Sequence, residues 1–310
     1  MVTKMRIVVA LGGNALLRRG EPAEAATQRA HVLEVASALA DLASDHELVI
    51  THGNGPQVGL LALEADAYKA VAPYPLDILG AESQGMIGYL LVQALGSELP
   101  EREVVALLTQ VLVDSNDPAF SCPTKPIGPV YSEKEARELA AGRGWTVARD
   151  GEYFRRVVAS PEPKAVVELR AVERLVTAGA LVVCGGGGGI PVVEEAGALR
   201  GVEAVIDKDL TAALLAEKLG AEKLIVLTDV PYVERDWGTA AAAPIDASTP
   251  AELRELAFAA GSMGPKIEAA CRFVERTGGE AVIGSLADLG AVSRGEAGTR
   301  ILTTFALAIR

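Results

Sequence analysis

Short aliphatic runs that each end at a turn recur along this chain and alternate with helical patterns. Runs of this length suit strands that are buried on both faces, as in parallel sheets. The runs lie at 7–11, 48–51, part of 104–113, 181–184, 224–227 and 281–283. The helical patterns lie at 24–43, 57–69, 78–95, 164–178, 210–219, 251–260 and 267–276. This alternation predicts βαβ units and a layered α/β sandwich with a mainly parallel central sheet.

One segment, 115–163, breaks the alternation. It contains several prolines and a short polar helix pattern over 132–141, and it lies between a strand and a helix. A block this long in that position predicts an insertion with its own small fold, and such insertions are often lids. We therefore expect a small subdomain that protrudes from the sandwich.

The charge balance argues against several classes of partner. The 310 residues include 29 Lys and Arg against 41 Asp and Glu, a net charge of −12, whereas proteins that bind nucleic acid usually present a basic face. The three cysteines are far apart and support neither a disulfide framework nor a zinc site. The apolar run after the amino terminus is too short for a signal peptide, and no run is long enough to span a membrane. We expect a soluble cytoplasmic protein without nucleic-acid or membrane partners.

Three glycine turns directly follow predicted strands. They are Gly12-Gly13-Asn14, the segment 52–59 with Gly53-Asn54-Gly55, and the run 185–189. Glycine lets backbone N–H groups approach an anion, and a helix that begins after the turn adds its partial positive charge. Turns at the carboxyl ends of neighbouring strands also form the usual ligand crevice of an α/β sheet. These turns predict binding of phosphate or carboxylate groups.

Familiar nucleotide and hydrolase motifs do not fit these turns. The dinucleotide fingerprint is missing, since Gly59 falls one residue late after Gly53 and Gly55. A Walker A loop requires a Gly-Lys dipeptide, which the chain lacks, and the protein-kinase signatures are also missing. Three scattered histidines make a Ser-His-Asp hydrolase an unfavourable reading.

Three of the nine lysines have unusual neighbours. Lys125 stands between Thr124 and Pro126 in the insertion, whereas Lys208 and Lys266 stand at predicted helix starts. A lysine at a helix amino terminus opposes the helix dipole, but a bound phosphate would reverse that effect. The alternative is that these lysines are solvated and that the aspartates beside Lys208 are helix caps. Lysines, backbone N–H groups and Mg²⁺ suffice for phosphoryl transfer without a covalent nucleophile, and an aspartate could hold two of the ammonium groups.

Eight ordered blocks give the chain a resemblance to the carbamate kinases, of the amino acid kinase superfamily, along nearly its whole length. The blocks are ALGGNAL (10–16), THGNGPQVG (51–59), AESQGMIGY (81–89), NDPAF (116–120), PTKPIGP (123–129), GGGGGIPV (185–192), GVEAVIDKD (201–209) and GSMGPKIEAA (261–270). The resemblance implies a homodimeric three-layer αβα sandwich that transfers phosphate between ATP and carbamate, giving ADP and carbamoyl phosphate, with Mg²⁺ carried by the nucleotide.

The resemblance also implies roles for individual residues. Lys125, Lys208 and Lys266 would neutralise charge on the transferred phosphate, and Asp209 would organise them. Carbamate and phosphate would bind at Gly12, Gly13, Asn14, Gly53, Asn54 and Gly55. The nucleotide would bind at Gly186, Gly187, Thr228, Asp229, Tyr232 and Met263.

We expect a single domain over 1–310. In it, 1–220 would mainly bind carbamate and phosphate and would include the lid at about 115–163, and 221–310 would mainly bind the nucleotide. The lid departs from the family pattern Gly-Arg-Gly-Tyr-Arg-Arg, because this chain has Glu152 where the family has arginine, and Ala159 replaces the first proline of Pro-Ser-Pro.

Two other readings remain open at this point. One is a related kinase that uses another small acid or a phosphate acceptor. The other is a catalytically silent nucleotide-binding protein, which the loss of a motif lysine would have favoured, although all three are present. A nicotinamide oxidoreductase is disfavoured by the missing fingerprint.

Overall fold

An eight-stranded, mainly parallel sheet forms the centre of the molecule in the computed structural model, which describes residues 4–13, 16–17, 21–22, 24–256, 258 and 263–303. Its strand order is β15-β17-β16-β12-β1-β2-β9-β3, and β16 and β17 form its antiparallel pair. The strands are β1 Arg6–Leu11, β2 Glu47–His52, β3 Val104–Ala106, β9 Leu181–Val183, β12 Lys223–Thr228, β15 Ala247–Ser248, β16 Glu280–Ser285 and β17 Thr299–Ile301. The predicted α/β class with a mainly parallel sheet is confirmed.

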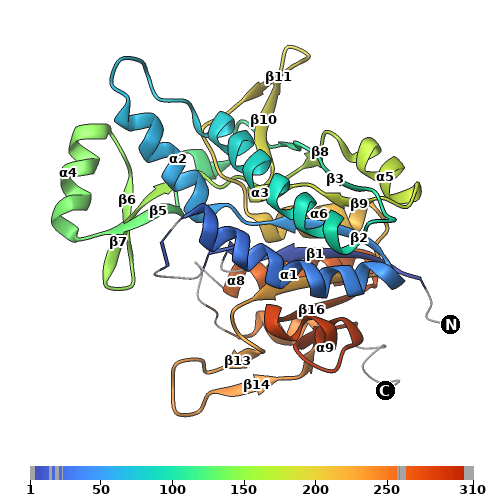
Figure 1. The fold of residues 1–310 in the computed structure, drawn as a ribbon. Coiled ribbons are helices and arrows are strands. Elements are labelled where there is room, and N and C mark those ends of the chain that lie inside the picture. The colour runs from blue at the N-terminus through green and yellow to red at the C-terminus, as the bar shows by residue number, and fades with distance from the viewer. Residues whose placement is uncertain are drawn as a thin grey trace.

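Helices cover both faces of this sheet and complete three layers (Figure 1). Side chains that alternate along β1 show the division, since Val8 faces one apolar cluster and Val9 faces the other. The first cluster includes α5 Leu169–Thr177, α6 Lys208–Lys218 and α8 Met263–Thr277. The second includes α1 Ala25–Asp45, α3 Leu76–Glu98 and α9 Leu289–Arg294. The central strands are buried on both faces, which explains their continuous aliphatic sequences.

A second sheet has the order β11-β10-β4-β8 and was not predicted. Its strands are β4 Gln110–Leu112, β8 Ala165–Val166, β10 Ile190–Glu195 and β11 Ala198–Gly201. The run 104–113 therefore divides between two sheets, β3 in the first and β4 in the second. The predicted helix at 164–178 likewise begins as strand β8 before α5. Short apolar runs do not reveal such divisions, because periodicity needs length.

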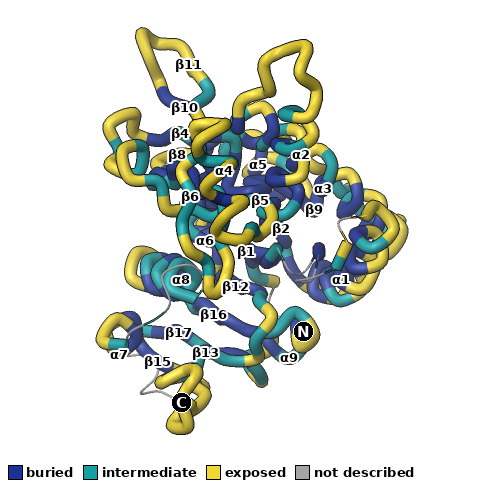
Figure 2. The backbone as a smooth tube through the Cα atoms, turned by 90° about the vertical axis from the view of Figure 1, so that its left-hand side faces the viewer, coloured by how far each residue is buried: buried dark blue, intermediate teal, exposed yellow. Residues whose placement is uncertain are grey.

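Residues 125–158 build a small separate sheet with a helix of their own. The sheet has the order β5-β7-β6, formed by β5 Lys125–Tyr131, β7 Tyr153–Val158 and β6 Val147–Asp150. Helix α4, Glu133–Arg143, begins at a capping box in which Ser132 and Glu135 bond each other's backbone N–H. Figure 2 shows much of this region as exposed or intermediate, in contrast to the buried central strands.

The small sheet docks on helix α2, Gly55–Ala67, through a close backbone approach. A Cβ atom at Gly59 would lie 2.1 Å from the Cα atom of Gly128, so a side chain there would push the two elements apart. Ile127 and Val158 join Val58 of α2 in a small apolar cluster beside this contact. An ion pair between Arg143 of α4 and Asp66 of α2, at 2.8 Å, adds to this contact, so the insertion rests on the main body mainly through α2.

A β-hairpin and a short helix complete the described fold. The hairpin, β13 Val233–Arg235 and β14 Ala243–Ile245, projects from the end of the molecule near β16 (Figure 1). Helix α7, Pro250–Arg254, is capped by Thr249 and Glu252. No helix in the described part of the chain is long and apolar enough to cross a membrane.

Candidate active site

A buried carboxylate lies between two lysine ammonium groups at the start of α6. The side chain of Asp209 is 3% exposed, and its two oxygens accept from Lys208 Nζ at 2.5 Å and from Lys266 Nζ at 3.1 Å. Burial would raise the pKa of Asp209, but the two lysines outweigh it and hold the pKa well below its usual range. The carboxylate is therefore ionised and lies between two cations. Its role as their organiser in catalysis stays a prediction.

Burial and the contact with Asp209 shift the pKa values of the two lysines in opposite directions. Burial is the largest influence on Lys208 and lowers its pKa. Burial also opposes the charge of Lys266, but attraction to Asp209 prevails and raises the pKa of Lys266. Asp207 also raises the pKa of both lysines, and Asp229 raises that of Lys266. Because each ammonium group has three N–H donors and donates to Asp209 with one of them, both lysines can also bind an anion.

The fold brings these three groups together through α6 and α8, which pack side by side. Asp207 caps α6, with its Oδ1 atom accepting the N–H groups of Asp209 at 2.9 Å and Leu210 at 3.3 Å. Lys208 follows as the first residue of the helix, and Lys266 is the fourth residue of α8. Both lysines therefore stand near helix amino termini, where a bound phosphate would offset the unfavourable dipole.

Lys125 reaches the same region from the insertion. Its Nζ atom lies 2.5 Å from Oδ2 of Asp207, the oxygen that does not cap α6. Asp207 therefore combines a capping role with a charged contact to the insertion. Sequence reasoning considered it a helix cap and missed the second role, because the contact joins residues 82 positions apart.

The first two glycine turns meet Lys208 at the carboxyl ends of β1 and β2. A Cβ atom at Gly53 would lie 3.1 Å from the Gly13 nitrogen and 3.4 Å from Cδ of Lys208. On the other side, a Cβ atom at Gly12 would lie 3.0 Å from the carbonyl oxygen of Leu227 in β12. The turns predicted to bind the acceptor thus adjoin the lysines, whereas Asn14 lies outside the described residues.

Asn54 is held in place at the start of α2. Its Nδ2 atom donates to Oγ of Ser83 on α3 at 2.8 Å, and Gly55 is the first residue of α2. The predictions did not assign a role to Ser83, although it belongs to the conspicuous 81–89 segment. Next to Asn54, the ring of His52 is fully buried, and burial lowers the pKa of His52 to about 4.

Four of the predicted nucleotide residues lie near the end of β12 and the start of α8. Thr228 ends β12, and its Oγ1 atom donates to Asp229 at 3.0 Å. Tyr232 is partly buried in the turn that leads to β13. Met263 begins α8, one helical turn before Lys266, and packs on the apolar cluster of that face. Since β12 adjoins β1, Thr228 lies beside the Gly12 turn, and a Cβ atom at Gly12 would lie 3.9 Å from the Cα atom of Thr228.

The other two predicted nucleotide residues lie elsewhere. Gly186 and Gly187 are buried in the turn after β9, and β9 adjoins β2 on the side away from β12. A Cβ atom at Gly187 would lie 2.1 Å from Nδ2 of Asn54, and its φ of +64° also favours glycine. Their packing favours support of Asn54, and the nucleotide role stays a prediction.

The two residues of the insertion that depart from the family pattern, Glu152 and Ala159, lie at different places. Glu152 is exposed in the turn between β6 and β7. Ala159 is buried, and its carbonyl oxygen accepts from Val205 N at 2.9 Å. Of the two arginines that match the family pattern, Arg155 donates to the carbonyl oxygen of Gly128 and Arg156 lies over the ring of Trp145. Both arginines therefore organise the insertion in this structure.

Across the described residues, there is no group of three or more His, Cys, Asp or Glu side chains that could hold a metal ion. The carboxylates nearest the site, Asp207 and Asp209, are already paired with lysines. The donor set therefore fits a metal that keeps phosphate oxygens among its ligands, as Mg²⁺ does in many kinases.

Comparison with known proteins agrees with this arrangement. Residues 5–285 match the model of the Amino acid kinase family. A carbamate kinase of Rhizobium meliloti is 54% identical over 305 residues, 97% of this chain and 94% of that protein. One from Haemophilus influenzae is 55% identical over 299 residues, 96% of each.

Solved structures agree as well. The structure of a carbamate kinase from Giardia lamblia bound to AMP-PNP has a TM-score of 0.87 at 39% identity, covering 97% of this chain and 99% of that one. The same enzyme bound to citric acid gives a TM-score of 0.91. This chain belongs to the amino acid kinase family and, within it, to the carbamate kinases.

Proposed function

We propose that this protein transfers a phosphoryl group reversibly between ATP and carbamate, giving ADP and carbamoyl phosphate. The observation that carries the proposal is the buried Asp209 carboxylate between Lys208 and Lys266, beside the glycine turns of β1 and β2. Such an arrangement supplies positive charge at fixed positions without a covalent nucleophile, which is what phosphoryl transfer requires.

In the forward direction, an oxygen of carbamate attacks the γ-phosphorus while the bond to the β,γ-bridging oxygen breaks. The electron pair leaves on ADP. Lys208 and Lys266 neutralise charge on the transferred group, and Lys125 approaches it from the insertion, leaving Asp207. Asp209 keeps its two lysines in position throughout, which lowers the barrier because no reorganisation is needed at the moment of reaction.

The acceptor would bind at Gly12, Gly13, Asn14 and the 53–55 turn. These residues offer backbone N–H groups and small amide side chains, and none is an arginine that could clamp an α-carboxylate. A very small planar acid should therefore be preferred over amino acids such as glutamate or aspartate.

The nucleotide would bind beside β12, at Thr228, Asp229, Tyr232 and Met263. This order along the sheet edge, with β12 next to β1, would direct the γ-phosphate toward the acceptor turns. Mg²⁺ would be bound through the nucleotide phosphates and would neutralise part of their charge. Gly186 and Gly187 remain candidates on the far side of the acceptor turns.

The decisive assay measures ATP formation from ADP and carbamoyl phosphate, with acetyl phosphate as the matched alternative donor. We expect faster turnover with carbamoyl phosphate. In the opposite direction, glutamate should not support ATP consumption at the rate of carbamate. A preference for acetyl phosphate or glutamate would contradict the proposal and point to a related kinase.

We also propose that the protein is a homodimer, as its membership in the carbamate kinases implies, and that it is cytoplasmic. Light scattering on the purified protein should give about twice the chain mass of 32.2 kDa. A mass of one chain at micromolar concentration would contradict the dimer without affecting the proposed reaction.

A further inference from the structure

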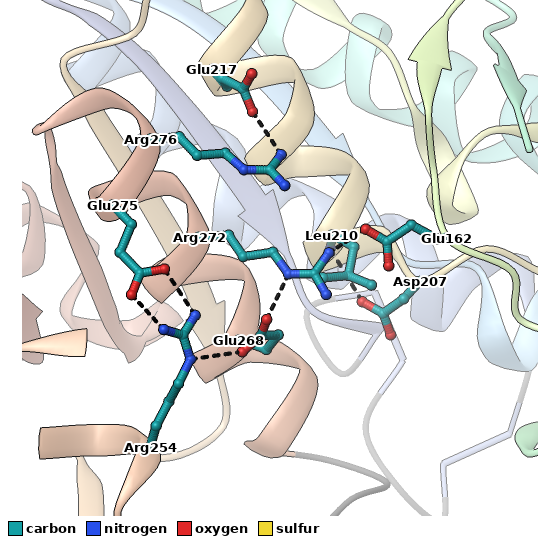
Figure 3. A network of polar contacts seen from close by, with 9 residues as sticks. All are labelled: Glu162, Asp207, Leu210, Glu217, Arg254, Glu268, Arg272, Glu275 and Arg276. Atoms are coloured by element: carbon teal, nitrogen blue, oxygen red, sulfur yellow. Dashed lines mark hydrogen bonds and ion pairs between the residues drawn. The ribbon is translucent and has the colours of Figure 1, made fainter. Parts of the chain in front are cut away.

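Arg272 joins the end of the insertion to the helix that carries Lys266. It lies on α8, and its guanidinium forms an ion pair with Glu162, the residue just before the chain returns to the main body. The same guanidinium donates to Glu268 at 2.6 Å, and Arg254 in turn binds Glu268 and Glu275 (Figure 3). Arg272 thus bridges two parts of the molecule, whereas Glu268 and Arg254 hold the bridge on α8.

Glu162 is itself firmly placed relative to the insertion. Its backbone N–H donates to Oδ2 of Asp117 at 2.9 Å, and Asp117 lies where the chain enters the insertion. The other oxygen of Asp117 accepts from Ala119 N at 2.9 Å. One aspartate therefore ties the segments that enter and leave the insertion together at the point that Arg272 contacts.

This point is close in sequence and structure to Lys125. Lys125 pairs with Val158 in the β5–β7 ladder, and Glu162 follows Val158 by four residues. On the other side of the bridge, Lys266 precedes Arg272 by six residues on one helix, about 9 Å of helix axis. The bridge therefore lies four residues along the chain from the insertion strand that pairs with Lys125, and six residues along α8 from Lys266.

The second tie between these parts is the Lys125–Asp207 ion pair, which cannot survive unchanged if Lys125 turns to a phosphoryl group. While Lys125 contacts substrate, the Glu162–Arg272 pair would remain as the charged link between insertion and α8. The Glu162–Arg272 pair can therefore hold the insertion in a defined position during phosphoryl transfer, when Lys125 has left Asp207.

We propose that Arg272 is a positioning residue, which sets the placement of the insertion and so aligns Lys125 with Lys266 across the transferred phosphoryl group. This inference rests on the proposed function. The guanidinium of Arg272 donates to Glu162 and Glu268, so Arg272 acts on the two lysines through Glu162 and α8.

Arg276 offers a matched control one helical turn away. It is on the same helix and binds Glu217 of α6 at 3.0 Å, so its ion pair links two main-body helices and not the insertion. Its side chain is 53% exposed, against 28% for Arg272. A purely structural loss of an ion pair on α8 should therefore be reproduced by the control.

The first experiment compares Arg272→Met with Arg276→Met. For Arg272→Met we expect kcat to fall about tenfold, the KM for ATP to change less than about twofold, and amide exchange across 115–163 to accelerate. Arg276→Met should change neither kcat nor exchange of the insertion. Equal effects of the two variants on kcat and on exchange would overturn the proposal.

The second experiment tests the coupling. Glu162→Gln should resemble Arg272→Met, and the double variant should be no slower than either single variant, because each removes the same link. Arg272→Lys should restore part of kcat, since lysine can still reach Glu162. Additive losses in the double variant would overturn the proposal.

The outcomes separate this inference from the proposed function. Amide exchange of the insertion needs no substrate and tests the bridge even if carbamoyl phosphate is not a substrate. A wild-type protein inactive with carbamoyl phosphate would contradict the proposed function. Unaltered exchange in Arg272→Met and Glu162→Gln would contradict the bridge while leaving the proposed reaction intact.

Discussion

The carboxyl edge of the central sheet and the insertion hold their lysines in opposite ways. Lys208 and Lys266 stand on helices that pack against the sheet, and their side chains are 11% and 14% exposed around a buried carboxylate. Lys125 stands on a small sheet with a largely polar helix, α4, in which one residue, Ala136, is buried. Its side chain is 29% exposed.

This difference indicates a division between a rigid site and an adjustable one. Extensive apolar burial fixes the main-body lysines, whereas Lys125 depends on the contact of the insertion with α2, its pair with Asp207 and the Glu162–Arg272 bridge. Arg143 of α4 adds an ion pair with Asp66 of α2. Regions with few buried contacts open at low free energy. We therefore expect the insertion to move more readily than the cluster around Asp209.

The largest expected effect comes from breaking the rigid site. We expect Asp209→Asn to lower kcat by one to three orders of magnitude, about 1.4–4 kcal/mol in the barrier. The neutral amide cannot hold two ammonium groups that repel each other. Steady-state rates and thermal melts on the same variant give the answer. A loss of stability with an intact kcat would mean that Asp209 is merely structural, because removing one member of a buried ion pair leaves the others uncompensated.

The main body was predictable from the sequence because its signals are long and regular. The runs at 7–11 and 48–51 became β1 and β2, and the pattern at 210–219 became most of α6. The second sheet was not predicted. Its strands β4 and β8 have three and two residues and lie inside segments predicted as one strand and one helix, and no element was predicted over 190–201, where β10 and β11 lie. Burial in a parallel sheet leaves a clear pattern, whereas a two-residue strand does not.

The candidate site was predictable where residues cluster in the sequence. Lys208 and Asp209 are adjacent, and glycine turns after predicted strands indicated the carboxyl edge of the sheet. Contacts between distant residues left no such signal: Lys125 with Asp207, Asn54 with Ser83, and Arg272 with Glu162. A charged side chain alone does not reveal which opposite charge the fold brings to it, so these pairs required the structure.

A pH dependence distinguishes the buried edge from the insertion, which contains no histidine. Burial lowers the pKa of His52 from 6.5 to about 4, so folding favours the neutral ring. The contribution of His52 to the free energy of unfolding is therefore fully present above pH 6.5 and is lost as the pH falls toward 4. The loss amounts to roughly 3 kcal/mol of unfolding free energy at 1.36 kcal/mol per pH unit.

Urea unfolding of the wild type and of His52→Asn at pH 7.5 and 4.5 checks this expectation. Asparagine does not titrate, so the variant should lose less stability between the two pH values than the wild type does. His46, whose pKa is also lowered by burial, is present in both proteins and cancels in the difference. Parallel stability profiles would contradict a buried neutral His52.

Substitution of Lys125 in the insertion should change kcat more than it changes the affinity for the nucleotide. We expect Lys125→Met to lower kcat about 10- to 100-fold, or about 1.4–2.7 kcal/mol, while the KM for ATP changes less than about twofold. The reason is that the residues proposed to bind the nucleotide belong to the turn after β12 and the start of α8, not to the insertion. Lys134→Met removes an exposed lysine of α4 and serves as the control.

Amide exchange tests the lid movement directly. Exchange across 115–163 should slow when ADP and a carbamate mimic are both bound to the wild type, because closure would exclude water from the phosphoryl group. Unchanged exchange, together with a wild-type rate for Lys125→Met, would return Lys125 to the role of a solvated surface residue.

The smallest expected effect comes from a test of whether the insertion and the central sheet unfold separately. Ser132 caps α4, and Ser132→Ala should destabilise that helix by about 1 kcal/mol, which corresponds to about fivefold faster amide exchange over 133–143. Because the insertion has little buried apolar area, this change should remain local and leave exchange in β1 unaltered. Thr249→Ala removes the same type of capping box from α7, on the main body, and should leave exchange over 133–143 unchanged. Faster exchange in β1 of Ser132→Ala would show that insertion and sheet unfold as one cooperative unit, and a lid that moves independently would then be excluded.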